Sequence, residues 1–181
     1  DYEKMYFNRF ELLRKAYERF SPDKEYEKFI KENEEWLTDY CLYMAIKDWQ
    51  GGVSWIEWEE GYRNRLPEYM KKAEEELKEE IGFYQFQQYK FACQWKKLHD
   101  YANEKGIEII GDIPIYVAFD SADTWANPKL FQFDEENFPT AVAGCPPDGF
   151  SATGQLWGNP LYNWEYHKET GYTWWLERIA H

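Results

Sequence analysis

Apolar residues recur at helical spacing through most of the first 104 residues of the chain. Phe10, Leu13, Tyr17 and Phe20 lie three or four residues apart, which places them on one face of an amphipathic helix. Two further apolar stripes comprise Trp36, Leu37, Tyr40, Tyr43 and Met44, and then Tyr84, Phe91, Trp95, Leu98 and Ala102. This pattern predicts a mainly helical region over residues 1–104.

Glycine and proline residues mark the ends of these predicted helices. The dipeptide Ser21–Pro22 combines a cap residue with a first-turn proline and predicts a helix start. Gly51–Gly52 interrupts the helical pattern, and a further acidic helix is expected after Pro67. Gly106 stands where a glycine commonly ends a helix.

The pattern changes from residue 105 onward. The run 107–119, IEIIGDIPIYVAF, is short and rich in β-branched residues, which predicts a buried strand. A long helix, a glycine and then a buried strand are typical of one βα repeat of a parallel α/β fold. Chemistry in such folds collects just past the carboxyl ends of the strands, so Asp112 becomes a candidate functional residue. A carboxylate beside a buried strand is also costly unless it is paired or used.

The rest of this second part, residues 105–181, is rich in turns. Residues 120–125 predict the start of a short helix, and residues 171–181 predict a final one. Between them, the stretch 144–164, GCPPDGFSATGQLWGNPLYNW, carries apolar and aromatic residues broken by glycine and proline at nearly every step. We expect this stretch to form neither a helix nor a long strand.

Composition and charge limit the classes of partner. The net charge of the 181 residues is −13, and no stripe of Lys and Arg is present, so neither nucleic acid nor an anionic membrane surface is an expected partner. No apolar run is long enough to span a bilayer, and no signal peptide is recognisable. The three isolated cysteines suggest neither a disulfide framework nor a zinc site and fit a reducing cytoplasm. We interpret His99, His167 and His181 as surface or packing residues, and we expect neither a metal nor a cofactor.

Four aspartates in the second part are candidates for carboxylate chemistry. A retaining glycosidase or transglycosidase needs two carboxyl groups ~5 Å apart, and Asp112, Asp120, Asp123 and Asp148 are available. Aspartate is also a common turn and cap residue, so capping outweighs function for Asp120 and Asp123 by roughly two to one. For Asp112 the balance favours function.

The aromatic stretch suggests sugar binding. A sugar ring presents C–H groups on its flat faces and hydroxyls around its rim, so a binder needs aromatic platforms beside amides and carboxylates. The stretch interleaves Phe150 and Trp157 with polar residues, namely Asp148, Ser151, Gln155 and Asn159. A rigid loop that plugs the end of a barrel is an equally good interpretation of the same residues.

Three motifs in a fixed order identify a family. They are GDIPIYV followed by DSAD.WA.P, then AGCPPDGFS, and then GQLWGNPLYNW. On these motifs the chain resembles the 4-α-glucanotransferases, also called amylomaltases or disproportionating enzymes, from about Tyr26 onward.

The resemblance implies a (β/α)8 TIM barrel decorated by helical insertions. This chain would be an α/β fragment of it, with a mainly helical insertion subdomain over 1–104 and a central slice of the barrel over 105–181. The implied activity transfers a segment of an α-1,4-glucan, or maltooligosaccharide, to the 4-hydroxyl of an acceptor sugar. The transfer proceeds by double displacement with retention of configuration.

The resemblance also assigns roles to individual residues. Asp112 matches an acid that binds or organises the donor sugar, Phe150 an aromatic on a mobile loop that covers the substrate, and Gln155 and Trp157 residues that line the glucan groove. Asn159 belongs to the same signature. With Asp148 from the aromatic stretch, the predicted substrate-binding residues are Asp112, Asp148, Phe150, Gln155, Trp157 and Asn159. Gly149 stands where many members carry a larger residue, so we expect a barer covering loop.

Two catalytic motifs of the family do not occur in these 181 residues. They are an Arg-(Ile/Leu)-Asp-His motif with the nucleophile and a Glu followed by Asp-Leu-Gly. We therefore expect a catalytically inactive fragment of a cytoplasmic enzyme, with no catalytic residue of its own. Two alternatives stay open, a non-catalytic carbohydrate-binding module and a helical interaction domain whose aromatics are all core. Exposed strand edges of a barrel slice would also favour self-association of the fragment.

Overall fold

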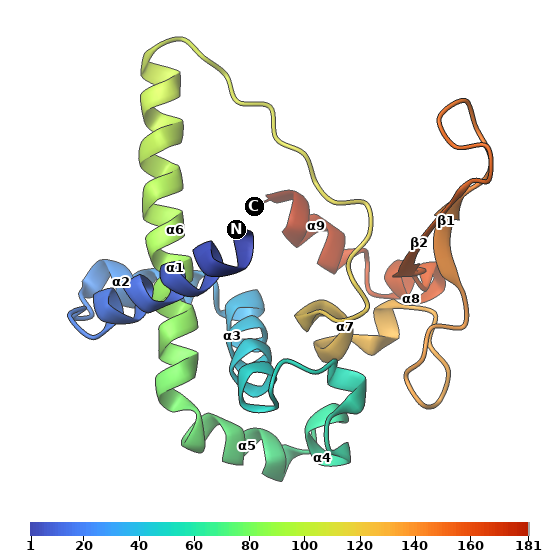
Figure 1. Cartoon of the computed structure of the whole chain (residues 1–181), viewed down its shortest axis with the longest axis horizontal. Coiled ribbons are helices and arrows are strands. Elements are labelled where there is room, and N and C mark those ends of the chain that lie inside the picture. Colours follow the sequence, from blue (N-terminus) through green and yellow to red (C-terminus); the bar gives the residue numbers. More distant parts are fainter. Residues whose placement is uncertain (181) are drawn as a thin grey trace. The chain divides into compact units, whose positions relative to one another are not determined.

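The computed structural model describes residues 1–180, except for the side chains of Glu3 and Tyr6. The chain forms two compact units (Figure 1). We call the first, Asp1–Trp49 with Pro67–Ile110, the helical unit, and the second, Gln50–Leu66 with the chain from Gly111 onward, the hairpin unit. His181, which we expected at the surface or in packing, lies outside the described residues. None of the described helices has the length and apolar character needed to cross a membrane.

The helical unit confirms the helices predicted from apolar spacing. Its elements are α1 (Tyr2–Tyr17), α2 (Lys24–Glu32), α3 (Glu34–Trp49), α5 (Pro67–Glu76) and α6 (Lys78–Glu104). The start predicted at Ser21–Pro22 is displaced, because Asp23 is the cap, and its carboxylate accepts a hydrogen bond from the Tyr26 amide at 2.8 Å. Gly106 ends α6 as expected, with a φ of 73° that favours glycine.

Apolar packing between α3 and α6 forms the core of the helical unit. Leu37, Cys41 and Tyr84 are buried together, and burial raises the pKa of the Cys41 thiol to about 12. This cysteine is therefore an unreactive packing residue. Phe83 is also buried on α6 and lies between the rings of Phe10 and Tyr17, with centroid separations of 6.2 and 5.7 Å.

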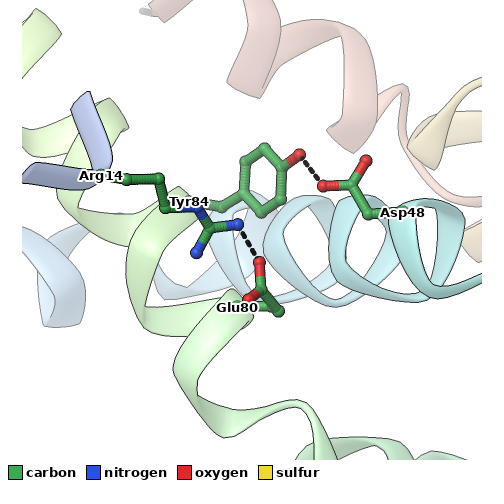
Figure 2. Close-up of polar contacts among 4 residues, drawn as sticks. All are labelled: Arg14, Asp48, Glu80 and Tyr84. Atoms are coloured by element: carbon green, nitrogen blue, oxygen red, sulfur yellow. Dashed lines mark hydrogen bonds and ion pairs between the residues drawn. The ribbon is translucent and has the colours of Figure 1, made fainter. Parts of the chain in front are cut away.

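Two polar contacts add to this packing at α6 (Figure 2). The Tyr84 hydroxyl donates a hydrogen bond to Asp48 Oδ2 on α3 at 2.5 Å. The Arg14 guanidinium on α1 pairs with Glu80 and also lies over the Phe83 ring at 3.6 Å. Because Tyr84 and Glu80 both belong to α6, these contacts join this helix to α3 and to α1.

The carboxyl-terminal half of α6 extends beyond the other helices of its unit (Figure 1). Part of the apolar stripe predicted for this helix is exposed there. Of its members, Phe91, Trp95 and Leu98 are 64%, 45% and 55% exposed, whereas Ala102 is buried. The helix prediction is confirmed, but most of this half of the stripe faces solvent.

The hairpin unit consists of short elements joined by irregular segments. They are η1 (Trp55–Glu57), α4 (Glu60–Arg63), α7 (Ala122–Ala126), η2 (Pro128–Leu130), β1 (Val142–Cys145), β2 (Gln155–Pro160), α8 (Trp164–Glu169) and α9 (Thr173–Ala180). The short helix predicted near residues 120–125 is α7, and the predicted final helix is α9. The strands β1 and β2 form an antiparallel hairpin with a register shift between Val142 and Gly144.

Residues 50–66 belong to the hairpin unit, although their place in the sequence predicts that they belong to the helical part. The reason is tryptophan packing. Trp55 Nε1 donates to the Phe119 carbonyl oxygen at 2.8 Å, and Trp125 Nε1 donates to the Tyr62 carbonyl oxygen at 2.9 Å. Trp55, Tyr62 and Trp125 are buried, and Phe119 is not. These contacts join residues 50–66 to the later segment of the same unit.

The strand predicted over residues 107–119 is wrong for this structure. The segment forms no strand, and four of its isoleucines, at positions 107, 109, 110 and 115, are exposed, with Ile110 at 95% and Ile115 at 71%. A strand needs a neighbour for its backbone hydrogen bonds, and the only sheet among the described residues is the β1–β2 hairpin. The described chain is therefore mostly helical with one small two-stranded sheet.

Candidate functional site

Five of the six predicted substrate-binding residues lie on the β1–β2 hairpin. Asp148 and Phe150 lie in the connecting loop. Every second position of β2 from its start carries one of the others, namely Gln155, Trp157 and Asn159. The stretch 144–164, for which we expected no helix and no long strand, contains the six-residue strand β2. Figure 1 shows the loop in orange, projecting away from the short helices of the same unit.

Hydrogen bonds from the backbone to Asp148 fix the loop. Asp148 Oδ1 accepts from the amides of Phe150 at 2.9 Å and Ser151 at 2.8 Å, and these bonds hold the pKa of the Asp148 carboxyl below its usual value. Ser151 Oγ donates to the Gly154 carbonyl oxygen at 2.7 Å. The carboxylate of Asp148 is therefore engaged in shaping the loop.

Two glycines allow the hairpin backbone to come close to itself. Gly154 has a φ of 75°, and a Cβ there would lie 2.6 Å from the Cys145 carbonyl oxygen. A Cβ on Gly144 would lie 2.6 Å from the Gln155 carbonyl oxygen. Gly149, in contrast, has open space around it and no positive φ, so of these three positions only Gly154 and Gly144 require glycine.

Phe150 and Trp157 present aromatic surface to solvent. The Phe150 side chain is 99% exposed in the loop, and Trp157 is 48% exposed on β2. Trp157 Nε1 donates to Gln155 Oε1 at 3.0 Å, which orients both side chains and leaves the amide nitrogen of Gln155 as a donor. The arrangement places an indole face beside an amide, the combination that a sugar ring requires.

Asn159 and Tyr116 join the hairpin to the segment that follows Asp112. Asn159 Nδ2 donates to the Val117 carbonyl oxygen at 2.8 Å. The Tyr116 ring lies 6.1 Å from the Trp157 ring and stacks on Tyr162 at 5.7 Å with an interplanar angle of 7°. The amide nitrogen of Asn159 thus already has a partner inside the protein.

Asp112 lies apart from the hairpin residues. It is exposed within the irregular segment, and no described hydrogen bond or ion pair joins its carboxylate to the hairpin. Within the described chain, the structure brings together Gln155 and Trp157 directly but does not bring Asp112 to them.

The capping interpretation is wrong for Asp120 and Asp123. Ser121 is the cap of α7, and its Oγ accepts from the Thr124 amide. Asp120 Oδ1 instead accepts from the Trp55 amide at 3.3 Å, and Asp123 Oδ1 accepts from Trp174 Nε1 at 3.0 Å. Both carboxylates hold distant segments of the hairpin unit together.

An aromatic cluster behind the hairpin was not anticipated as a unit. Tyr162 is buried at its centre, and its ring contacts Phe131, Trp174 and Trp175, at centroid distances of 5.5, 5.6 and 5.0 Å. His167 is fully buried beside it, its Nε2 lies 3.1 Å from the Leu130 carbonyl oxygen, and burial lowers the pKa of this imidazole. The interpretation of His167 as a packing residue is confirmed.

Sequence reasoning missed Tyr116, Tyr162 and Arg178 as neighbours of the site. Two of them lie inside the family motifs, GDIPIYV and NPLYNW, so the motif positions were the available signal. Arg178 on α9 carried no such signal. Among the described residues, no group of three or more His, Cys, Asp or Glu side chains is arranged to hold a metal ion.

Comparisons with known proteins agree with this geometry. A 4-alpha-glucanotransferase from Clostridium butyricum is 47% identical over 182 residues, and one from Aquifex aeolicus is 48% identical over 180 residues; each alignment covers 99% of this chain. The solved structure of an amylomaltase from Streptococcus agalactiae in complex with acarbose superposes with a TM-score of 0.92 at 42% identity. The chain spans 37% of the length of each of these three proteins.

The family model that matches, Glyco_hydro_77, is described as 4-alpha-glucanotransferase, and the match runs over residues 1–181. It covers the helical unit and the hairpin unit alike, including the hairpin with its exposed aromatic residues. The chain therefore belongs to the 4-alpha-glucanotransferase family.

Proposed function

We propose that this chain is the glucan-binding part of a 4-alpha-glucanotransferase that transfers segments of α-1,4-glucans to acceptor sugars. Membership of the family and the names of the relatives support the reaction class. The observation that carries the proposal is the pairing of Trp157 with Gln155, because a half-exposed indole held beside an amide suits a sugar face and its hydroxyl rim. Acarbose bound to the related amylomaltase supports a sugar-derived ligand.

Five of the six candidate residues have a role at the sugar in this proposal. Trp157 and Phe150 stack on sugar rings, Gln155 donates to a sugar hydroxyl, and Asp112 accepts from the hydroxyls of the donor sugar. Asp148 keeps the loop in the conformation that presents Phe150, through its bonds to the Phe150 and Ser151 amides. The lack of a larger residue at Gly149 leaves Phe150 as the main apolar cover of the loop.

The reaction proceeds in two balanced displacements. In the first, the bond between C1 of the donor sugar and the leaving O4 breaks, a carboxylate bonds to C1, and the leaving oxygen takes a proton from an acid. In the second, the O4 of the acceptor bonds to C1, the bond between C1 and the carboxylate breaks, and the acceptor hydroxyl gives its proton to the group that acted as the acid in the first step. A loop that excludes water favours the sugar acceptor over hydrolysis.

The two carboxyl groups of this mechanism lie outside the chain in our proposal. The motifs that would carry them, Arg-(Ile/Leu)-Asp-His and Glu-Asp-Leu-Gly, do not occur in its sequence. We accordingly expect the isolated chain to be inactive. A cytoplasmic location is part of the proposal and is supported by the free thiols of Cys41, Cys93 and Cys145.

The proposal includes a barrel architecture for the whole protein. Residues 1–104 would be a helical insertion subdomain and residues 105–181 a slice of a (β/α)8 barrel. The exposed half-stripe on α6 and the exposed isoleucines of residues 107–119 support this, because both present apolar side chains that a barrel sheet would cover. The same exposed surface would favour self-association of the isolated chain.

Incubation of the full-length gene product with maltotriose tests the function. Disproportionation gives glucose together with maltooligosaccharides longer than the substrate, whereas hydrolysis gives only shorter products. Trp157→Ala is expected to lower kcat/KM by about tenfold or more through lost stacking, and Leu156→Ala, at an 81% exposed neighbouring position, serves as its control.

The outcomes separate the candidate functions. Absence of longer products would contradict the transferase, and binding of maltotriose without any redistribution would instead indicate a non-catalytic carbohydrate-binding module. Redistribution catalysed by the isolated 181-residue chain would contradict the expected placement of the catalytic carboxylates.

A further inference from the structure

Three side chains from separate parts of the hairpin unit donate hydrogen bonds to the backbone of one short segment, residues 114–117. Arg178 Nη2 donates to the Pro114 carbonyl oxygen at 3.1 Å. The Tyr162 hydroxyl donates to the Ile115 carbonyl oxygen at 2.9 Å, and Asn159 Nδ2 donates to that of Val117 at 2.8 Å. The donors come from α9, from the chain after β2 and from β2 itself.

This segment depends on these side chains because it has no strand partner. Residues 107–119 form no helix or strand, so their carbonyl groups lack a regular backbone ladder. The path of an irregular segment is set by the donors that bind its backbone. Here the donors are side chains, which fix the segment at three points within four residues.

The donors are themselves held by aromatic packing. Tyr162 is 3% exposed, and its ring contacts Trp174 and Trp175. The Arg178 guanidinium lies 4.4 Å from the ring centroid of Trp174 and 5.2 Å from that of Trp175. One aromatic cluster therefore orients two of the three donors toward the segment.

The segment follows the candidate residue Asp112 and contains Tyr116, a neighbour of the sugar site. Asp112 lies two residues before Pro114, and Tyr116 lies between the fixed positions with its ring 6.1 Å from Trp157. A shift of the segment would move Asp112 and Tyr116 relative to Trp157, although neither residue donates or accepts any of the three bonds.

We propose that Asn159, Tyr162 and Arg178 are positioning residues that set the path of residues 114–117, and with it the placement of Tyr116 against the Trp157 ring and the position of Asp112 just before the segment. This inference rests on the proposed function and deepens it. It gives the amide of Asn159 a role inside the protein, and it adds to the site two residues that carry no chemistry of their own.

A double-mutant cycle with Asp112 in the full-length protein tests the inference. Tyr162→Phe removes only the hydroxyl and is expected to lower kcat/KM for maltotriose by about tenfold. In an Asp112→Asn background the same change is expected to cost less than about twofold, because the misplaced carboxylate is already gone. Tyr166→Phe is the matched control. Its ring packs against the same cluster, and its hydroxyl makes no hydrogen bond among the described residues, so kcat/KM is expected to stay within about twofold.

Equal losses in the two backgrounds would overturn the inference, because a general loss of structure does not depend on Asp112. No loss in either background would overturn it as well. If Tyr162→Phe does not fold, Asn159→Leu tests the same bond network from β2 with the same cycle and the same two criteria.

Hydrogen exchange provides a readout that does not depend on activity. Amides in peptides covering residues 111–119 are expected to exchange at least about threefold faster in Tyr162→Phe than in the wild type and in Tyr166→Phe. If the wild-type protein fails to redistribute maltotriose, the proposed function fails, and exchange alone decides the positioning role. Unchanged exchange over these peptides would contradict it.

Discussion

The contacts that stabilise the interior of the helical unit differ in kind from those that stabilise the interior of the hairpin unit. In the helical unit, backbone hydrogen bonds are made within helices, and side chains contribute ring packing, as Phe83 does between Phe10 and Tyr17. In the hairpin unit, side chains donate to the backbone of distant segments. Trp55 donates to Phe119 and Trp125 to Tyr62.

This difference changes what a single side chain contributes to each unit. Loss of a ring from the helical unit removes apolar contacts and leaves a cavity. Loss of a tryptophan from the hairpin unit does the same and also leaves a buried carbonyl oxygen without its donor. Substitutions in the hairpin unit should therefore cost more for the same change in volume, and they should disturb the segment whose carbonyl was bound.

We expect the largest loss of unfolding free energy for Trp125→Ala, and we compare it with Phe83→Ala. The two side chains are 1% and 0% exposed. Truncation of a buried aromatic costs about 3–5 kcal/mol of unfolding free energy. We expect Trp125→Ala near the upper end of this range, because the Tyr62 carbonyl oxygen loses its donor, and Phe83→Ala near the lower end. Urea unfolding measures both, and an equal or larger loss for Phe83→Ala would contradict the comparison.

A smaller effect is expected from Gly154→Ala in the hairpin. The φ of 75° opposes a side chain at this residue, and so does the Cys145 carbonyl oxygen, which would lie 2.6 Å from the added methyl group. Strain of this kind costs about 1–3 kcal/mol, measurable as a lower melting temperature and weaker maltotriose binding by the full-length protein. Gly149→Ala, in open space on the same loop, is the matched control and should be nearly neutral. Comparable losses of melting temperature in Gly154→Ala and Gly149→Ala would contradict the close backbone approach at Gly154.

The smallest expected effect concerns pH and involves His167. Burial lowers the pKa of this imidazole below its ordinary value of 6.5, so the unfolded chain binds a proton more readily than the folded one. The unfolding free energy should therefore fall as the pH drops through 6.5 and should level off below the lowered pKa of the folded state. Urea unfolding at a series of pH values measures this slope.

His167→Gln should remove that pH dependence, because the side chain no longer titrates. His99→Gln, on α6 of the helical unit, is the control and should retain it. A slope that survives in His167→Gln would assign the pH dependence to another group.

Local spacing was sufficient to predict the helical unit. The helices α1, α3 and α6 and the stop at Gly106 were confirmed, because helix formation depends on residues three and four positions apart. The cap of α2 was displaced by two residues, to Asp23, since several residues near a helix start can supply an oxygen. The fold of residues 107–119 was predicted wrongly, because a strand depends on a partner that spacing along one segment does not specify.

The candidate site was predictable to the extent that its residues are neighbours in sequence. Gln155 and Trp157 lie two residues apart on one strand and therefore share a face, so their contact follows from the motif. Arg178 could not be found in this way, because it acts on a carbonyl group 64 residues earlier in the chain. Asp120 and Asp123 were assigned to capping from composition, whereas their partners, Trp55 and Trp174, lie far away in sequence.

The sequence by itself determined the helices, the family motifs and the aromatic and amide chemistry of the hairpin, since each depends on residue type and short-range spacing. Only the tertiary structure decided that residues 50–66 join the hairpin unit and that Tyr162 and Arg178 hold the segment after Asp112. The physical reason is that side-chain donors find backbone carbonyls by proximity in space. A carbonyl group is present at every residue, so the sequence does not mark which one is bound.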